Sequence, residues 1–118
     1  MKKIYHLSTC STCQRIIKEL DPSSDVLLQD IKTEKITATQ LEELKDLAGS
    51  YEALFSRRAM KYRSLGLNDM QLEEDDYKKY IVEEYTFLKR PVILIEDSVF
   101  IGNSKKVVEK AKDALNCT

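Results

Sequence analysis

Hydrophobic residues in this 118-residue chain follow two kinds of spacing, and the order of these patterns predicts the fold. Apolar and polar residues that alternate indicate strands, whereas apolar residues three or four positions apart indicate helices. The predicted strands are residues 3–7, 26–28, 91–95 and 99–101. The predicted helices are residues 11–20, 39–48, 72–85 and 105–115, with one or two short helices over 53–67 that break near residues 56–58. The resulting order is β-α-β, a helical block and then β-β-α, which predicts an α/β fold with a sheet covered by helices.

Local signals predict where several helices begin and end. Thr39 followed by Glu42 has the form of a capping box, and Gly49 is a suitable stop for the same helix. Ser104 is predicted to cap the last helix. The acidic residues 73–76 suit the positive end of a helix dipole, so they are predicted to open the helix before the third strand.

Composition restricts the kinds of partner that the chain is expected to have. Hydrophobic residues make up 42% and charged residues 33%, with a formal net charge of −1, so no strong overall charge favours nucleic acid or an anionic membrane. No apolar run approaches the length of a membrane span, and no signal-peptide core follows the N-terminus, so we expect a cytoplasmic protein. The single histidine excludes a multi-histidine metal site, and we expect no bound metal.

A pair of cysteines lies where the first predicted strand leads into the first predicted helix. Cys10 and Cys13 enclose Ser11 and Thr12, and a cysteine pair in this position is a recognisable redox arrangement. Unpaired N–H groups and the positive dipole at the helix start favour a thiolate on Cys10, and the thiolate is the nucleophile. Because a helix start also binds anions, Ser11 and Thr12 are expected to contribute to substrate binding.

Cys13 and Cys117, unlike Cys10, each allow two interpretations. Cys13 shares a helix face with Ile17 and Leu20, so it is either a small core residue or a resolving thiol that closes a disulfide with Cys10. Cys117 is either an incidental free thiol or a remote resolving thiol. An odd number of cysteines argues against a secreted disulfide framework.

Several motifs together resemble the arsenate reductase (ArsC) family, which includes the Spx transcription regulators and the YffB-type thiol reductases. These motifs are Tyr5-His6 with Cys10 four positions after His6, Asp30–Glu34, Ile36-Thr37, Leu54–Arg58, Leu65-Gly66-Leu67 and Leu88–Ile93. The resemblance implies a thioredoxin-like mixed sheet with a helical insertion between its halves. One domain over 1–118 is expected, with 1–30 and 87–118 as the core and about 37–86 as the insertion.

The resemblance also implies two alternative functions. In the first, the Cys10 thiolate attacks arsenate or a disulfide, and glutathione, a glutaredoxin or Cys13 resolves the intermediate. Glutathione or another thiol is then the reductant, a glutaredoxin or thioredoxin is a partner, and no bound cofactor is needed. In the second, the protein is an Spx-like redox-sensing regulator that binds RNA polymerase, and the cysteine pair is its switch.

His6, Arg90 and Pro91 are further candidate site residues. A lone histidine on a strand is usually structural, but a positive charge near a thiol lowers its pKa, and the resemblance implies that His6 activates Cys10. X-Pro bonds are usually trans, whereas the resemblance implies a cis Arg90–Pro91 bond opposite Cys10. That bond would direct Arg90 into the site, where a guanidinium suits a tetrahedral oxyanion.

Residues 57–63 form a basic run without an acidic residue. Such a run is usually a solvated helix face, but the resemblance implies an oxyanion-binding arginine here. Counting back from Tyr62 favours Arg58, whereas strict matching to classical arsenate reductases puts Ser56 at that position and Arg57 next to it. We therefore expect Arg58 first and Arg57 second.

The segment after the last predicted strand departs from the classical pattern. Classical members carry a third arginine there, whereas residues 99–104 contain none. Asn103 offers a hydrogen bond without a charge, and Lys105 lies at a helix start. This departure moves the prediction from arsenate toward a general thiol reductase.

Overall fold

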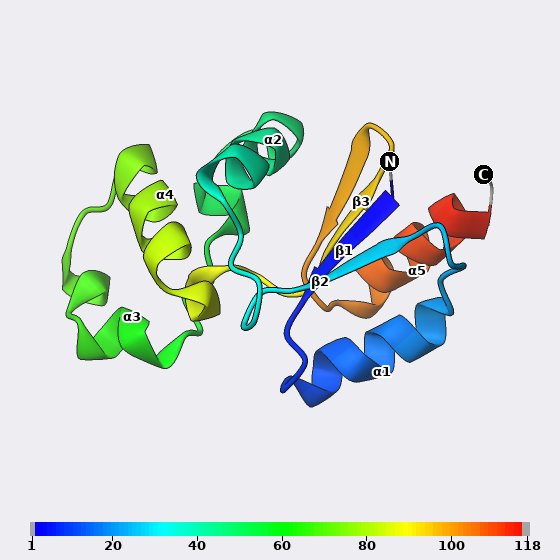
Figure 1. Ribbon diagram of the computed structural model, residues 1–118. Helices are drawn as coiled ribbons and strands as arrows, with labels where there is room; N and C mark the ends of the chain where they lie inside the picture. The colour runs from blue at the N-terminus through cyan, green and yellow to red at the C-terminus, as the bar shows by residue number, and fades with distance from the viewer. Residues whose placement is uncertain (1, 117–118) are drawn as a thin grey trace. The chain divides into compact units, whose positions relative to one another are not determined.

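The computed structural model describes residues 2–116, so Cys117 lies outside the described residues. The elements are, in order, β1 (Lys2–His6), α1 (Ser11–Leu20), β2 (Leu27–Asp30), α2 (Ala38–Ala48), η1 (Glu52–Leu54), α3 (Met60–Ser64), η2 (Leu67–Asp69), α4 (Glu74–Glu83), η3 (Tyr85–Phe87), β3 (Val92–Ile95), β4 (Ser98–Ile101) and α5 (Lys105–Asn116). Here η marks a short 3₁₀ helix. Figure 1 shows the predicted order of β-α-β, helical block and β-β-α.

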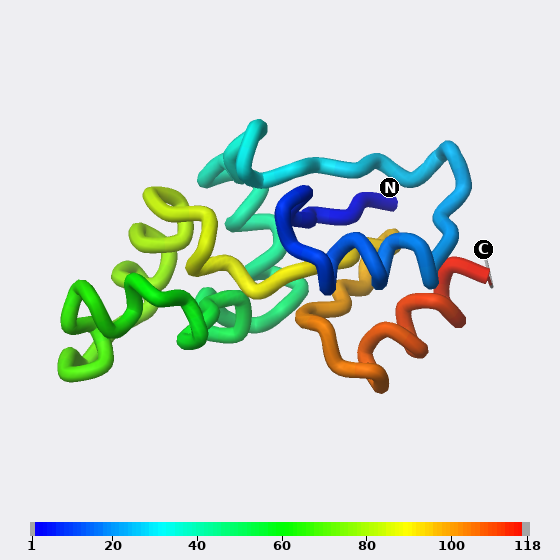
Figure 2. The backbone as a smooth tube through the Cα atoms, turned by 90° about the horizontal axis from the view of Figure 1, so that it is seen from below, coloured from blue at the N-terminus to red at the C-terminus, as the bar shows by residue number. Residues whose placement is uncertain are grey.

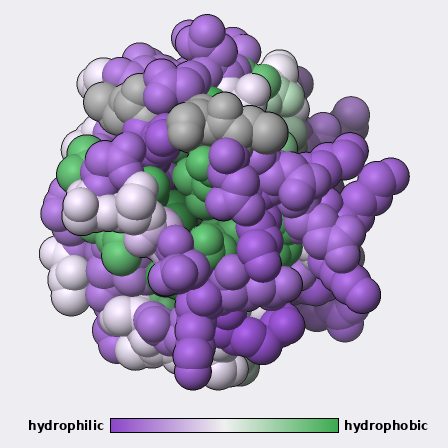
Figure 3. Space-filling model, turned by 90° about the vertical axis from the view of Figure 1, so that its right-hand side faces the viewer, coloured by the Kyte–Doolittle hydropathy of each residue, from purple (hydrophilic) through white to green (hydrophobic). Residues whose placement is uncertain are grey.

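The chain divides into two compact units. Unit 1 contains residues 1–34 and 90–118, and unit 2 contains residues 35–89. Unit 1 therefore holds every strand named above together with α1 and α5, and unit 2 holds the helical block. Among the described residues, no helix is both long enough and apolar enough to cross a membrane. Figure 3 shows one face of the molecule, where hydrophilic side chains surround a smaller apolar area.

The sheet of unit 1 has the strand order β2-β1-β3-β4. β1 pairs parallel with β2, whereas β3 runs antiparallel to both β1 and β4, so the predicted mixed sheet is confirmed. Figures 1 and 2 show α1 and α5 side by side on the same face of the sheet. Because β1 and β2 are parallel, His6 and Asp30 are partners at the same edge of the sheet, where β3 begins.

The core of unit 1 follows from the two kinds of spacing in the sequence. Its buried residues come from the sheet, from the residue before β2 and from the facing sides of α1 and α5. They are Ile4, Ile16, Leu20, Val26, Ile93, Ile95, Val108 and Ala111. β3 is buried at all four positions, which confirms the apolar run at 91–95 as an interior strand. Burial of these side chains on one face of the sheet fixes α1 in place, and Cys10 lies at the start of that helix.

The ends of several elements differ from the prediction, and strand pairing explains those of β2 and β4. β2 covers Leu27–Asp30 and not residues 26–28, because its pairing with β1 continues to Asp30 although Leu27 and Leu28 are exposed on this edge strand. Ser98 is already the first residue of β4, so the turn before it lies at Glu96 and Asp97. Strand pairing determines the ends of β2 and the start of β4, and the hydrophobic pattern alone does not show how the strands pair.

The predicted capping box at Thr39 and Glu42 is wrong, because the N-cap of α2 is Thr37, two residues earlier. The Thr37 hydroxyl accepts a hydrogen bond from the Gln40 N–H at 3.1 Å, and the Gln40 side chain accepts one from the Thr37 N–H at 3.1 Å. Both pairs of residues fit the same pattern, so the sequence did not distinguish them. Gly49 ends α2 with a φ of 99°, as predicted.

An aromatic cluster forms the centre of unit 2. The fully buried Phe55 ring stacks on Phe87 at a centroid distance of 5.1 Å and contacts the rings of Tyr62 and Tyr77. Two backbone hydrogen bonds join the same segments, from Ser56 N–H to the Phe87 carbonyl and from the Lys89 N–H to the Leu54 carbonyl. The cluster therefore joins the segment that carries Arg57 and Arg58 to the end of the helical block.

Candidate functional site

Cys10 is the N-cap residue of α1, so its sulfur lies at the positive end of the helix. The residue has extended backbone angles, and its N–H donates to the Leu7 carbonyl at 3.0 Å, which closes a tight turn between β1 and α1. Its side chain makes no capping hydrogen bond and is only partly buried. The predicted position of Cys10 at the start of a helix is confirmed.

The surroundings of Cys10 favour its thiolate. Burial raises the pKa of the Cys10 thiol, but this effect is outweighed by the Cys13 N–H, the Cys13 thiol, the Thr12 N–H and the charge of Arg90. The net result is a pKa below the ordinary value of a thiol. Thr12 therefore acts on the sulfur through its backbone, while the Ser11 side chain is exposed at the helix start.

Cys13 lies one turn further along α1 and is fully buried. Burial raises the pKa of the Cys13 thiol to about 11, and negative charge on Cys10 acts in the same direction. The two residues are free cysteines whose side chains interact with one another. Cys13 thus combines the position of a core residue with contact to the candidate nucleophile, and both interpretations of this residue stay open.

Arg90 belongs to unit 1 and acts on both sulfurs. The Arg90–Pro91 peptide bond is cis, as the resemblance implied. The guanidinium charge of Arg90 lowers the pKa of Cys10 and also that of Cys13. Pro91 is buried at the end of the sheet where β3 begins. A positive charge close to a thiolate is suited to hold an anionic group beside it.

Iodoacetamide is expected to alkylate Cys10 at neutral pH and to leave Cys13 unmodified in the folded protein, because the pKa of Cys10 is lowered and that of Cys13 is about 11. Arg90→Met should raise the pH at which Cys10 reacts, since it removes a neighbouring positive charge. Mass spectrometry of the alkylated peptides across a pH series measures both effects. Lys89→Met, which removes the adjacent exposed cation, should leave the Cys10 profile unchanged; an equal shift in both variants would contradict the role of Arg90.

His6 lies on β1 beside Asp30 of β2. Its Nδ1 atom is buried and has no hydrogen-bond partner among residues 2–116. Positive charge on His6 is one of the causes that lower the pKa of the Asp30 carboxyl. The structure thus connects His6 with Asp30, and the expected action of His6 on Cys10 stays a prediction.

Asp30 and Gln14 hold the loop before Cys10 in place, a role that the sequence did not predict for either residue. The Asp30 carboxylate accepts hydrogen bonds from the N–H groups of Ser8 and Lys32, both at 3.2 Å, while the Gln14 amide donates to the Ser8 carbonyl at 3.0 Å. Ends of neighbouring parallel strands meet at one edge of a sheet, so an acidic residue at the end of the second strand was the available signal. The predicted strand stopped at Leu28, which concealed it.

Asp30→Ala is expected to loosen the Cys10 loop, whereas Asp30→Asn keeps an oxygen acceptor and should have a smaller effect. The Ser8 hydroxyl and N–H and the Lys32 N–H lower the pKa of Asp30 despite its partial desolvation. Its stabilising effect is therefore present above the ordinary carboxyl pKa and is lost as the pH falls through the lowered value. Urea unfolding across a pH series and the Cys10 alkylation rate are the measurements; equal behaviour of the two variants would contradict positioning by the hydrogen bonds.

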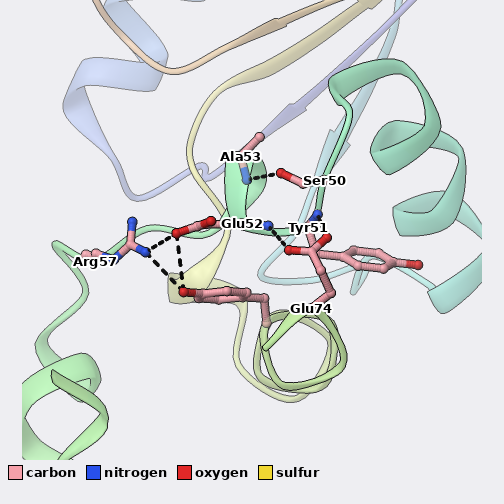
Figure 4. Close-up of polar contacts among 7 residues, drawn as sticks. Ser50, Tyr51, Glu52, Ala53, Arg57 and Glu74 are labelled. Carbon is pink, nitrogen blue, oxygen red and sulfur yellow. Dashed lines mark hydrogen bonds and ion pairs between the residues drawn. The ribbon is translucent and has the colours of Figure 1, made fainter. Parts of the chain in front are cut away.

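Arg57 and Arg58 belong to unit 2 and have different surroundings. As Figure 4 shows, the Arg57 guanidinium pairs with the Glu52 carboxylate, and it donates to the Tyr77 hydroxyl at 3.1 Å. The Glu52 interaction is the main cause that raises the pKa of Arg57. Arg58 is exposed, and within residues 2–116 it has no hydrogen bond or ion pair. Arg57 is thus engaged inside unit 2, and Arg58 is the more accessible cation.

The Glu74 carboxylate supports the segment that precedes these arginines. It accepts hydrogen bonds from the N–H groups of Tyr51 at 2.7 Å and Glu52 at 3.2 Å, at the start of η1 (Figure 4). The acidic start of α4 therefore does more than complement its own helix dipole. No group of three potential ligands that could hold a metal ion occurs among the described residues.

These features define the class of protein to which the chain belongs. A strand that leads through a Cys-x-x-Cys loop into a helix, next to a strand that opens with a cis-proline, is typical of thioredoxin-like thiol proteins. A model described as the ArsC family matches residues 5–111, and the chain belongs to the ArsC family.

The chain is similar to two kinds of curated protein, a transcriptional regulator and an arsenate reductase. The chain is 25% identical over 113 residues to "Global transcriptional regulator Spx 2" of Bacillus anthracis, which covers 93% of this chain and 86% of the relative. It is 24% identical over 112 residues to "Arsenate reductase" of Neisseria meningitidis, which covers 91% of this chain and 94% of the relative. Both kinds of relative therefore extend along nearly the whole chain, and they support a thiol-dependent reductase or an Spx-like regulator.

A solved structure supports the fold. The chain is similar to an arsenate reductase from Vibrio cholerae with a TM-score of 0.77 and 18% identity, over 96% of each chain. This likeness confirms the predicted thioredoxin-like architecture.

Proposed function

We propose that the protein is a thiol-dependent reductase in which the Cys10 thiolate attacks an electrophilic sulfur or an oxyanion. The observation that supports this most directly is the environment of Cys10 at the start of α1, which lowers the pKa of its thiol next to Arg90 and Cys13. A thiolate held at neutral pH is the reactive form of cysteine. Arg90 is the group proposed to hold the negative charge of the substrate.

With a disulfide substrate, the Cys10 thiolate attacks one sulfur, and the other sulfur leaves as a thiolate. The resulting mixed disulfide no longer carries negative charge on Cys10. Since that charge is one cause of the high pKa of Cys13, forming the mixed disulfide makes Cys13 easier to deprotonate. The Cys13 thiolate then attacks the Cys10 sulfur, and the second substrate thiol leaves. The substrate disulfide has gained two electrons, and the cysteine pair, which lost them, is now a Cys10–Cys13 disulfide. Glutathione or another thiol reduces it.

With arsenate, the Cys10 thiolate forms a sulfur–arsenic bond and an arsenate oxygen leaves as water. A second thiol, from glutathione, a glutaredoxin or Cys13, then attacks the Cys10 sulfur. The new sulfur–sulfur bond releases arsenite, so arsenic gains the two electrons that the thiols lose. The absence of an arginine in residues 99–104 argues for disulfides over arsenate as the substrate.

The second candidate is a redox-sensing regulator that binds RNA polymerase, and the relative named Spx 2 is the observation that favours it. In this role the Cys10–Cys13 pair switches between dithiol and disulfide without turnover. The expected consequence is a change at the start of α1, where both sulfurs lie.

Two assays on the purified full chain distinguish these functions. The first measures reduction of arsenate and of a small disulfide with glutathione, with and without glutaredoxin. The second measures retention by the RNA polymerase α-subunit. Turnover that depends on Cys10 supports the reductase, whereas retention without turnover of either substrate would replace it with the regulator.

A further inference from the structure

A pocket between α1 and α5 has no part in the proposed reaction of Cys10. It lies wholly within unit 1, has a volume of about 180 Å³, and is lined by Arg15, Ile16, Glu19, Asn103, Lys105 and Val108. Ile16 and Val108 are core residues and are buried. The pocket therefore combines an apolar floor with charged and polar groups around it.

The pocket lies beside the middle and last turn of α1 and the start of α5. β4 is parallel to β1, because each is antiparallel to β3, so α1 and α5 both begin at the edge of the sheet where the Cys10 turn lies. Arg15 follows Cys10 by five residues, which is about 7.5 Å along a helix axis. Figures 1 and 2 show the two helices as neighbours that run in the same general direction.

The charged side chains of the pocket have no ionic partner within the described part of the chain. Arg15, Glu19 and Lys105 are all exposed, and in residues 2–116 none of them forms an ion pair or a side-chain hydrogen bond. Two cations and one carboxylate thus border one pocket, together with the Asn103 amide. A ligand that carries both a carboxylate and an ammonium group matches this set, because each of its charges meets an opposite charge.

We propose that this pocket binds the free α-amino-acid end of the thiol that reduces the enzyme, an inference that rests on the proposed reductase function. Arg15 and Lys105 bind the α-carboxylate, Glu19 accepts from the α-ammonium, and Asn103 contributes a neutral hydrogen bond. The γ-glutamyl end of glutathione is such a group, and its thiol lies on the next residue of the tripeptide. Binding here holds that thiol beside the start of α1, where the oxidised Cys10 is attacked.

Kinetics with two reductants test the proposal in the full-length protein. Arg15→Glu and Lys105→Glu should each raise the KM for glutathione by about tenfold, since each removes a charge-assisted contact and adds a repulsive charge. The rate with 2-mercaptoethanol, which carries neither charge, should not change. Lys18→Glu on α1 and Lys106→Glu on α5 make the same charge change outside the pocket and serve as matched controls. Equal effects of pocket and control variants, or equal effects on both reductants, would overturn the proposal.

A binding measurement separates this proposal from the proposed function. S-methylglutathione cannot react as a thiol, and its titration into ¹⁵N-labelled protein should shift the amide signals around residues 15–19 and 103–105 in the wild type but not in Lys105→Glu. Absence of turnover with every reductant would count against the reductase. Normal turnover with glutathione that is unaffected by Arg15→Glu and Lys105→Glu, or absence of these shifts, would overturn the pocket alone.

Discussion

Cys10→Ser is expected to abolish thiol-dependent reduction, with a loss of rate on the order of a thousandfold or more, as for other enzymes that lose their nucleophile. A serine hydroxyl at this position stays protonated at neutral pH, and it forms no sulfur–sulfur bond. The fold should be unaffected, because Cys10 is only partly buried and its side chain makes no capping hydrogen bond that the substitution would remove. Turnover of arsenate and of a small disulfide with glutathione measures the effect, and circular dichroism checks the fold.

Cys13→Ser is the matched comparison, since it makes the same change three residues later. If glutathione resolves the intermediate, this variant keeps most of its activity; if Cys13 does, it accumulates a mixed disulfide that mass spectrometry detects on Cys10. Burial of the serine hydroxyl in the core position of Cys13 is expected to lower stability as well, so the comparison is made well below the unfolding temperature. Full activity of Cys10→Ser would end the assignment of Cys10 as the nucleophile.

The elements that position the nucleophile were predictable from the sequence because burial dictates their spacing. α1 covers Ser11–Leu20 as predicted, and β3 is buried along its whole length. The start of α2 was not predictable, because Thr37 and Thr39 both satisfy the local pattern for a cap. Local hydrogen-bonding patterns recur along a chain, and only the packed structure selects among them.

The candidate site was predictable only where one residue type carries the chemistry. Cys10 follows from its place between a strand and a helix, but Asp30 becomes part of the site only through the parallel pairing of β1 with β2. Arg57 and Arg58 are neighbours in sequence with the same charge, and the Glu52 and Tyr77 contacts that engage Arg57 come from elsewhere in unit 2. Sequence identifies groups that are reactive by nature, whereas positioning and charge neutralisation depend on tertiary contacts.

Phe55→Ala is expected to destabilise the protein by about 3–5 kcal/mol, the usual cost of removing a buried aromatic ring. The Phe55 ring is fully buried and lies within 6 Å, between ring centroids, of Tyr62, Tyr77 and Phe87, so its removal leaves a cavity among three rings. Loss of the ring contacts with Phe87 and Tyr77 should also loosen the segment that carries Arg58, which only backbone contacts such as the Phe55–Leu88 β-bridge would then hold. Urea unfolding gives the change in free energy.

Tyrosine signals make this measurement specific to unit 2. The chain has no tryptophan, and five of its six tyrosines lie in residues 35–89, all except Tyr5. Near-ultraviolet circular dichroism therefore reports mainly on the aromatic cluster. Leu65→Ala is the matched control in the same unit, because its side chain is 55% exposed and its removal should change the free energy of unfolding by less than about 0.5 kcal/mol. A Phe55→Ala variant as stable as Leu65→Ala would mean that the cluster does not stabilise the segment before Arg58.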